Sequence, residues 1–324
     1  MLAIEALEVS KLYKDSRYAA LKKVSLNVES RQIFTLLGRN GAGKTTFVRI
    51  CASQLMPTSG TINVLGYDVV REPTRVRNLI SIVPQEGRPL RALTPWDHIY
   101  NWLKIRGENK YDAKEKAEKI LHKLELYEAK DTPAMNLSGG TKQKVLVAMA
   151  MAVDARLLFL DEPTIGLDPV SRRQVWSAIK DWKKDGGSIL LTTHYMDEAE
   201  MLSDNMVIIN KGRIIARGTI HDLRKIIPQN VRVDIAKDGF DTDLFKSYGS
   251  VVDIGIDTIR VFMFESAVKE LSQFAIEKNL RFSVSPITLD DVFVYLIDNG
   301  EGGEDYDAIL GYDSNDRKVD SIKE

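Results

Sequence analysis

The sequence predicts an α/β fold built on a buried sheet, followed by a smaller α+β domain. In the first part of the chain, short apolar runs typical of buried parallel strands alternate with amphipathic helical patterns. After "KGRIIARGT" the pattern changes to short alternating strands. A length of 324 residues also favours two domains. We therefore expect a first domain at 1–222, with a helical subdomain at about 86–156, and a second at 223–299.

Composition narrows the class of protein. Lys and Arg together number 45 against 46 for Asp and Glu, a balance that argues against a protein that coats nucleic acid. Hydrophobic residues make up 44% and mean hydropathy is -0.19, without an apolar run of the ~18 residues that span a bilayer. Glu5 and Glu8 interrupt the apolar N-terminus, and Cys51 has no second cysteine to pair with. We expect a soluble globular protein of a reducing cytosol, with no nucleic-acid partner.

The elements of the first domain follow from apolar periodicity. Residues 3–13 and 24–30 alternate as strands of an antiparallel subdomain, and residues 32–38 form an apolar strand that runs into glycines. Helical spacing covers 94–107 and 112–129 in the helical subdomain. Buried strands are then expected at residues 157–163, "LLFLDEP", and 188–194, "SILLTTH".

The second domain has the order strand, helix, strand, strand, helix, strand of a ferredoxin-like unit. The expected strands are 230–236, 251–256, 258–264 and 281–288, and the expected helices are 241–249, 265–279 and a closing one at 289–298. The segment after Gly300 carries eight acidic against three basic residues and few apolar ones. We interpret 300–324 as an acidic, flexible tail.

A P-loop pattern lies between the strand at 32–38 and the helical pattern after it. It comprises Gly38, Arg39, Asn40, Gly41, Ala42, Gly43, Lys44 and Thr45, with Thr46 next to it. Its glycines let successive backbone N–H groups face phosphates, Lys44 is expected to reach the β and γ oxygens, and Thr45 to ligate Mg²⁺. The alternatives are an incidental glycine-rich turn and a dinucleotide site, but Thr46 stands where the latter needs a third glycine.

Two acids end the strand at 157–163. Asp161 is expected near the metal, and Glu162 beyond it, where it can act as the general base for an attacking water. The alternative is that both acids cap the loop before Pro163. A second anion site is indicated by Ser138, Gly139 and Gly140, since an N-cap serine followed by glycines exposes backbone N–H groups at a helix start.

These motifs together resemble those of ATP-binding cassette (ABC) ATPases. The P-loop, "LSGG", "LFLDEPTIGLDP" and "LTTHYMDEAE" occur in the order and approximate spacing of that family, over about residues 4–222. The resemblance implies that two cassettes pack head to tail, so that the Ser-Gly-Gly helix start of one caps the γ-phosphate on the P-loop of the other. A homodimer is the simpler expectation, and pairing with a different cassette is the alternative.

The resemblance also assigns roles to single residues. Gln85 matches the Q-loop glutamine at the Mg²⁺ shell, Asp168 the D-loop at the dimer interface, and His194 the switch histidine that contacts the γ-phosphate. Tyr13 matches the aromatic residue that stacks on adenine. The alternatives are a core aromatic for Tyr13, an ordinary loop amide for Gln85 and a core histidine for His194. Arg39 replaces a more usual proline, and the signature continues Thr-Lys-Gln, both at tolerant positions.

The end of the cassette and "ITLDDVFVYL" look like the ABC-2 branch, whose cassettes energise export through separate membrane subunits. This implies ATP and Mg²⁺ as cofactors, an integral membrane permease as partner, and a peripheral position on the cytoplasmic face of the membrane. A groove for the permease is expected at Pro95, Trp96, Ile99, Tyr100, Trp102 and Leu103, with core packing as the alternative. The rival function is a soluble ABC ATPase acting on ribosomes or DNA.

The stretch Asn109 to Asp112 matches the N-K-x-D motif of GTPases. That motif requires an apolar strand before it, and "LKIRGE" is a poor strand. We interpret Asp112 instead as the N-cap of a helix that begins at Ala113.

Overall fold

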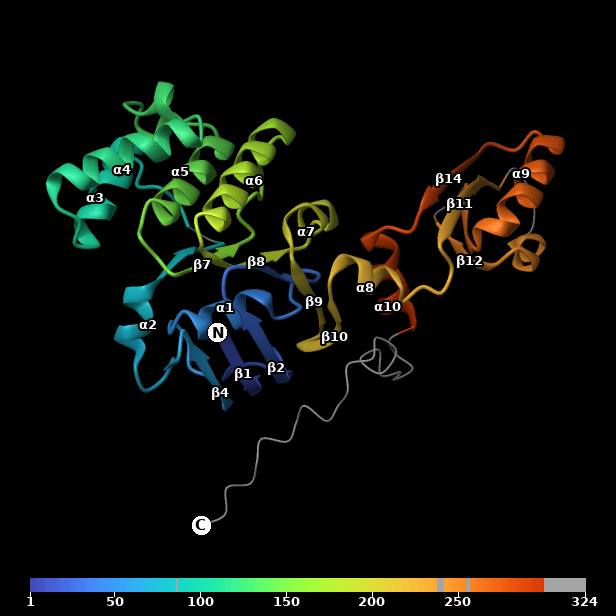
Figure 1. The fold of residues 1–324 in the computed structure, drawn as a ribbon, viewed down its shortest axis with the longest axis horizontal. Coiled ribbons are helices and arrows are strands. Elements are labelled where there is room, and N and C mark those ends of the chain that lie inside the picture. The colour runs from blue at the N-terminus through green and yellow to red at the C-terminus, as the bar shows by residue number, and fades with distance from the viewer. Residues whose placement is uncertain (86, 238–241, 255–256, 300–324) are drawn as a thin grey trace, which may run out of the picture. The chain divides into compact units, whose positions relative to one another are not determined.

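The computed structural model describes residues 1–85, 87–237, 242–254 and 257–299 (Figure 1). The chain divides into two compact units, of which the first spans Met1–Thr219 and the second begins at Ile220. The sequence predicts this boundary after residue 222. The acidic tail predicted for 300–324 lies outside the described residues.

A six-stranded sheet runs through the first unit. Its strands are β3 (Ile33–Leu37), β6 (Ile80–Val83), β7 (Leu157–Asp161), β8 (Ser188–Thr193), β9 (Asn205–Asn210) and β10 (Arg213–Gly218). They lie in the order β10-β9-β3-β8-β7-β6. All neighbours pair in parallel except β10, which is antiparallel to β9. Every residue of β3, β7 and β8 is buried, which explains why these segments read as unbroken apolar runs.

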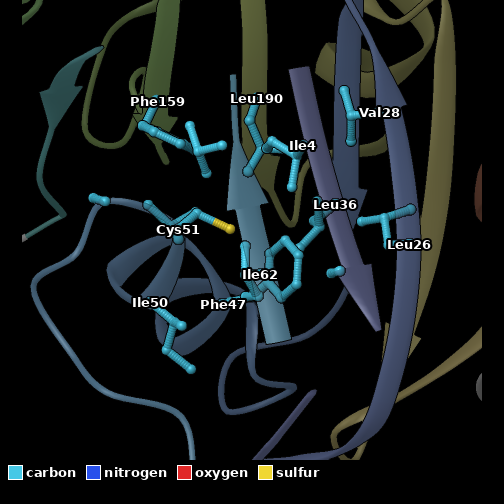
Figure 2. Close-up of a cluster of buried hydrophobic side chains, with 14 of the residues drawn as sticks. Ile4, Leu26, Val28, Leu36, Phe47, Ile50, Cys51, Ile62, Phe159 and Leu190 are labelled. Atoms are coloured by element: carbon cyan, nitrogen blue, oxygen red, sulfur yellow. The ribbon is translucent and has the colours of Figure 1, made fainter. Parts of the chain in front are cut away.

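A four-stranded antiparallel sheet covers one side of this layer. It consists of β1 (Leu2–Lys11), β2 (Leu21–Glu29), β4 (Ser59–Val64) and β5 (Tyr67–Asp68), in the order β2-β1-β4-β5. Helix α1 (Lys44–Cys51) packs between the two sheets. Figure 2 shows Phe47 and Cys51 of α1 in one apolar cluster with Ile4 and Ile62 of the antiparallel sheet and Phe159 of β7. This core holds the start of α1 against the ends of the parallel strands.

Helices cover the opposite face of the parallel strands. The helices of the first unit after α1 are α2 (Pro73–Leu79), α3 (Pro95–Ile105), α4 (Lys110–Lys123), α5 (Gly139–Met151), α6 (Pro169–Lys184) and α7 (Met196–Leu202), with 3₁₀ turns at Tyr127–Ala129 and Ala134–Asn136. Figure 1 shows α3 to α6 gathered on one side of β7 and β8, away from β1, β2 and β4. The helical subdomain predicted at about 86–156 corresponds to α3, α4 and α5.

One prediction about this subdomain is wrong. The N-cap of α4 is Asn109, whose side chain accepts hydrogen bonds from the backbone N–H groups of Tyr111 and Asp112, so Asp112 lies in the first helical turn. Asparagine caps a helix as well as aspartate does, and the choice between them depends on where the chain turns.

No described helix combines the length and apolar character that crossing a membrane requires.

The residues predicted to form the permease groove divide between the core and the surface. Pro95, Ile99 and Leu103 are buried on the core face of α3, and Ile99 and Leu103 belong to the apolar cluster beneath the helices. Trp96, Tyr100 and Trp102 pack against the same cluster. Pro95, Ile99 and Leu103 therefore belong to the core, while Trp96, Tyr100 and Trp102 stay partly exposed, so a groove formed by these three side chains stays a prediction.

The second unit contains a four-stranded sheet of its own. Its elements are α8 (Ile220–Arg224), β11 (Val231–Ala236), a 3₁₀ helix at Thr242–Ser247, β12 (Ser250–Asp253), β13 (Thr258–Met263), a 3₁₀ turn at Glu265–Ala267, α9 (Val268–Glu277), β14 (Phe282–Pro286) and α10 (Leu289–Asn299). The sheet is antiparallel throughout, in the order β12-β13-β11-β14. The first expected helix is a short 3₁₀ helix held by one fully buried side chain, Phe245. The ferredoxin-like assignment stays a prediction.

Candidate active site

The site lies at the carboxyl ends of three neighbouring parallel strands. The P-loop follows β3, Asp161 ends β7 and Glu162 comes directly after it, and His194 directly follows β8. Since the sheet order places β8 between β3 and β7, these three ends meet along one edge. Open parallel sheets bind ligands at this edge.

The P-loop has a backbone conformation that its glycines permit. Gly43 has φ of 111° and N-caps α1, and a Cβ there would meet the Ala20 carbonyl oxygen at 2.5 Å. A Cβ on Gly38 would come within 2.3 Å of the Ile209 carbonyl oxygen. Both positions therefore require glycine on steric grounds. Because the N-cap residue Gly43 has no side chain, no side chain caps the backbone N–H groups at the start of α1, as an anion site requires.

Lys44, Glu162 and His194 converge in the interior. The Lys44 Nζ donates to the Gly38 carbonyl oxygen at 2.7 Å and lies 3.3 Å from Glu162 Oε1. His194 Nδ1 lies 3.2 Å from the same oxygen, without hydrogen-bond geometry. Glu162 is 3% exposed and Lys44 is 4% exposed. The ammonium balances the charge of the ionised, buried carboxylate, which can then act as a proton acceptor.

Two features set Glu162 apart from an ordinary loop acid. Its φ of 52° is a left-handed conformation that side chains rarely adopt, so its backbone is strained at this point. Its Oε2 is buried and has no hydrogen-bond partner among the described residues. An unsatisfied carboxylate oxygen in the interior is a site for a further polar molecule, such as a water.

A second group of oxygen atoms surrounds Thr45. Its hydroxyl lies 3.1 Å from Gln85 Oε1 and 3.2 Å from Asp161 Oδ1, and its single proton is shared between these two acceptors. Thr192 also donates to Asp161 Oδ1. Burial raises the pKa of Asp161, and the neighbouring Glu162 adds to this, while hydrogen bonds from Thr192 and Thr45 and the charge of Lys44 oppose it. An added positive charge here would therefore stabilise the carboxylate.

Tyr13 lies at the rim of the P-loop helix. Its phenol oxygen is 3.2 Å from the Thr46 hydroxyl, its ring is partly exposed, and the Lys11 Nζ lies 5.5 Å from the ring centre. Tyr13 is therefore not a core aromatic. Of the remaining P-loop residues, Arg39 and Asn40 are exposed, and the Arg39 carbonyl accepts a hydrogen bond from Ala42 N–H.

Ser138, Gly139, Gly140 and Asp168 lie apart from this cluster. Ser138 N-caps α5 by accepting a hydrogen bond from Thr141 N–H, and Asp168 N-caps α6. A Cβ on Gly140 would touch Leu167 at 3.4 Å, so α5 begins beside the loop that leads to Asp168. Among the described residues, no hydrogen bond or ion pair joins Ser138–Gly140 to the P-loop. Of the two predicted anion sites, the structure therefore places the P-loop beside Asp161 and Glu162. It places the other one, Ser138–Gly140, apart from them.

The sequence reasoning missed Glu198 of α7 and Thr192 of β8. Thr192 orients Asp161, and Glu198 is fully buried behind the loop that follows Glu162. The signal available in the sequence was an acid, Glu198, in the first turn of the helix that begins two residues after His194. Its partners come from distant segments, so the pattern alone could not reveal the contact.

The comparisons with known proteins agree with this geometry. The ABC transporter family matches residues 21–165. The daunorubicin/doxorubicin resistance ATP-binding protein DrrA of Streptomyces peucetius is 33% identical, over 99% of this chain and 96% of that protein. A solved ATP-binding subunit of an ABC transporter is 27% identical, with a TM-score of 0.64, over 70% of this chain and 93% of that one.

A dimeric ATP-binding cassette in a post-hydrolysis state, bound to ADP and Pi, shares the fold at 23% identity and a TM-score of 0.62, over 67% of this chain and 98% of that one. The P-loop, the acids after β7 and the histidine after β8 define a nucleotide-hydrolysing α/β protein. The similarity to DrrA covers nearly the whole of both chains, which narrows the assignment from nucleotide hydrolases in general to ATP-binding subunits of ABC transporters. The chain belongs to the ABC transporter family, as an ATP-binding and ATP-hydrolysing transporter subunit.

Replacing Lys44 with alanine is expected to weaken ATP binding by about 10- to 150-fold. The ammonium is held beside the P-loop by the Gly38 carbonyl, and a hydrogen bond from a charged group contributes about 1.5–3 kcal/mol. Isothermal titration with ATP measures the change. The matched control is Lys114→Ala, an exposed lysine of α4. An unchanged Kd for ATP in a Lys44→Ala protein that melts like the wild type would contradict the P-loop role.

Proposed function

We propose that the chain hydrolyses ATP with Glu162 as the general base. The observation that carries this proposal is the buried Glu162 carboxylate, with Oε1 beside Lys44 and His194 and Oε2 free of hydrogen bonds to described residues. In this role Glu162 orients a water and takes its proton as the oxygen attacks the γ-phosphorus. Lys44 and His194 stabilise the charge that develops on the γ-phosphoryl oxygens, the P-loop N–H groups hold the phosphates, and Tyr13 stacks on the adenine.

The residues around Thr45 fit Mg²⁺. The hydroxyl of Thr45, the amide oxygen of Gln85 and the carboxylate of Asp161 are hard oxygen ligands, and the Gln85 and Asp161 oxygens lie 3.1 and 3.2 Å from the Thr45 hydroxyl. Mg²⁺ binds through few protein oxygens together with phosphates and waters, which agrees with the finding that no cluster of three His, Cys, Asp or Glu occurs in the described part of the chain. When bound, Mg²⁺ would neutralise charge on the β and γ oxygens.

We propose further that two cassettes act together, head to tail. Ser138, Gly139 and Gly140 form a helix start suited to phosphate, yet they make no described contact with the P-loop of their own chain. A second copy could bring its Ser138–Gly140 to that phosphate, with Asp168 near the contact. The fold shared with a dimeric cassette supports this arrangement. A homodimer needs no further protein, and a different cassette is the alternative.

The membrane partner proposed is a separate permease of the ABC-2 type, with the cassette bound at the cytoplasmic face of the membrane. Similarity to a drug-resistance ATP-binding protein over nearly its whole length supports a role in export. A pocket of about 500 Å³ lies between the segment after Gln85 and the start of α5, lined in part by Arg88, Arg91 and Lys142. None of these three cations forms an ion pair with another described residue. We propose that this pocket receives an acidic segment of the permease.

The test is a pull-down of tagged Glu162→Gln protein with ATP from gently solubilised native membranes, read by mass spectrometry. The expected result is a multi-span membrane protein in stoichiometric amount. Adding Arg88→Glu and Arg91→Glu should reduce its recovery several-fold, while the control Lys114→Glu should not. Recovery of ribosomal or DNA-bound proteins without a membrane subunit would instead establish a soluble ABC ATPase.

A further inference from the structure

Glu198 is a buried acid whose contacts the proposed mechanism does not use. Its side chain is 0% exposed. Oε1 accepts a hydrogen bond from the Thr164 hydroxyl at 2.7 Å and another from the Trp176 indole N–H at 2.9 Å. Oε2 is buried without a hydrogen-bond partner among the described residues. Burying a carboxylate costs free energy unless hydrogen bonds or opposite charges compensate for the lost water. We therefore asked which parts of the site the two hydrogen bonds of Glu198 connect.

Both hydrogen-bond donors follow Glu162 in the chain, Thr164 in the loop directly after it and Trp176 in α6. Thr164 follows Glu162 by two residues and is fully buried. Two successive turns shape this segment, in which the N–H of Ile165 donates to the Glu162 carbonyl at 3.3 Å and the N–H of Leu167 donates to the Thr164 carbonyl at 3.2 Å. Glu198 therefore holds the loop whose first residue is the strained Glu162.

Glu198 itself belongs to the segment that carries His194. Helix α7 begins at Met196, so the backbone at His194 is continuous with the helix that presents Glu198. The Thr193 hydroxyl accepts a hydrogen bond from Tyr195 N–H at 3.0 Å, which fixes the turn between strand and helix. The carboxylate of Glu198 thus joins the loop that positions Glu162 to the turn that positions His194.

Helix α6 supplies a second link between the same two segments. Arg172 precedes Trp176 by one helical turn, and its guanidinium donates to Asp197 at 3.1 Å. The same guanidinium lies 4.6 Å from the centre of the Tyr195 ring, whose centre lies 4.1 Å from that of His194. Both α6 side chains therefore brace the His194 turn, one in the interior through Glu198 and one at the surface.

We propose that Glu198 is a positioning residue, which holds the Glu162 carboxylate and the His194 imidazole in register by joining Thr164, Trp176 and α7. The proposal rests on the proposed roles of Glu162 and His194 in ATP hydrolysis. Burial raises the pKa of Glu198, and the Thr193 and Thr164 hydroxyls and the Trp176 indole oppose that rise. These donors suit an acceptor oxygen, so a glutamine amide oxygen can take the same hydrogen bonds while a leucine cannot.

The experiment compares Glu198→Leu and Glu198→Gln in the full chain, by steady-state ATP hydrolysis, ATP titration and thermal melting. For Glu198→Leu we expect kcat to fall about 10- to 100-fold with the Kd for ATP unchanged, because a displaced catalytic pair loses turnover rather than binding. Glu198→Gln should recover most of the turnover. A fall in melting temperature with kcat unchanged would show a role in stability alone and overturn the proposal.

A double variant separates this proposal from the role of Glu162. If Glu198 acts by positioning Glu162 and His194, adding Glu198→Leu to Glu162→Gln should lower kcat by a smaller factor than Glu198→Leu does in the wild type, because the part that acts through Glu162 is already lost. The same full factor in both backgrounds would overturn the positioning role. Wild-type turnover in Glu162→Gln alone would refute the general-base role instead. Should Glu198→Leu fail to fold, Trp176→Phe replaces it, since phenylalanine lacks the indole donor. Its control is Trp182→Phe on the same helix, and equal kcat in the two would likewise overturn the proposal.

Discussion

Changing Glu162 to glutamine should lower kcat for ATP hydrolysis by about 10²- to 10⁴-fold, the contribution of a general base. The change keeps the size and shape of the side chain, but the amide cannot take a proton from water. Binding of ATP should persist, because the Lys44 ammonium keeps its contacts with the carbonyls of Gly38 and Arg39. With hydrolysis blocked, we expect the ATP-bound form to accumulate as a dimer.

Phosphate release measures turnover, and size-exclusion chromatography with light scattering in ATP measures the dimer. The matched control is Glu115→Gln, an exposed acid of α4, which should behave like the wild type. ATPase activity near that of the wild type in Glu162→Gln would remove Glu162 from the role of base. Loss of turnover without dimer formation would retain the base and count against the head-to-tail arrangement.

The largest expected effect on stability comes from Asp291 in the second unit. Its buried carboxylate accepts two hydrogen bonds from Arg232, at 2.8 and 2.9 Å, and is also in contact with Arg260. Thr288 donates to it from both its N–H and its hydroxyl. Asp291→Ala would leave the Arg232 and Arg260 guanidinium groups, both largely buried, without this carboxylate. Breaking such a pair costs about 3–5 kcal/mol, which is a large part of the stability of a small domain.

Hydrogen exchange of the amides in β11 and β13 measures this loss within the second unit. The control is Asp290→Ala, since Asp290 is exposed and lies next to Asp291. The pH dependence of the stability of the second unit provides a second measurement. Burial alone would raise the pKa of Asp291, but the hydrogen bonds from Thr288 and Arg232 and the charge of Arg232 lower it overall. A depressed pKa means that this contribution is present above the ordinary aspartate pKa of about 4 and is lost as the pH falls below it. Equal protection in the Asp291→Ala and Asp290→Ala variants would contradict the prediction.

Local signals explain which parts of the site were predictable. The P-loop could be found because Gly38 and Gly43 occupy positions where a side chain would collide with nearby backbone, so the pattern follows from backbone geometry. The acids were predictable because β7 is wholly buried and Asp161 and Glu162 stand where it ends. The N-caps at Ser138 and Asp168 also depend on a few adjacent residues.

Long-range packing explains the failures. An apolar face on α3 reads the same whether it lines a groove or packs a core, and the structure buries Ile99 and Leu103 in the core. The segment Thr242–Ser247 has helical composition, but it is short and closes as a 3₁₀ helix around Phe245. The sequence did not predict roles for the buried acids Glu198 and Asp291, because their hydrogen-bond partners lie far away in the sequence.

By itself the sequence determined the order of the elements, the P-loop, the acids that end β7 and the family resemblance, since each depends on a short stretch of chain and its periodicity. Only the tertiary structure decided which distant side chains meet. It placed Lys44 and His194 beside Oε1 of Glu162, set Thr45 against Gln85 and Asp161, and left Ser138–Gly140 apart. The physical reason is that parallel strand order and the packing of α1 and α6 are set by burial of the whole core, which no local pattern encodes.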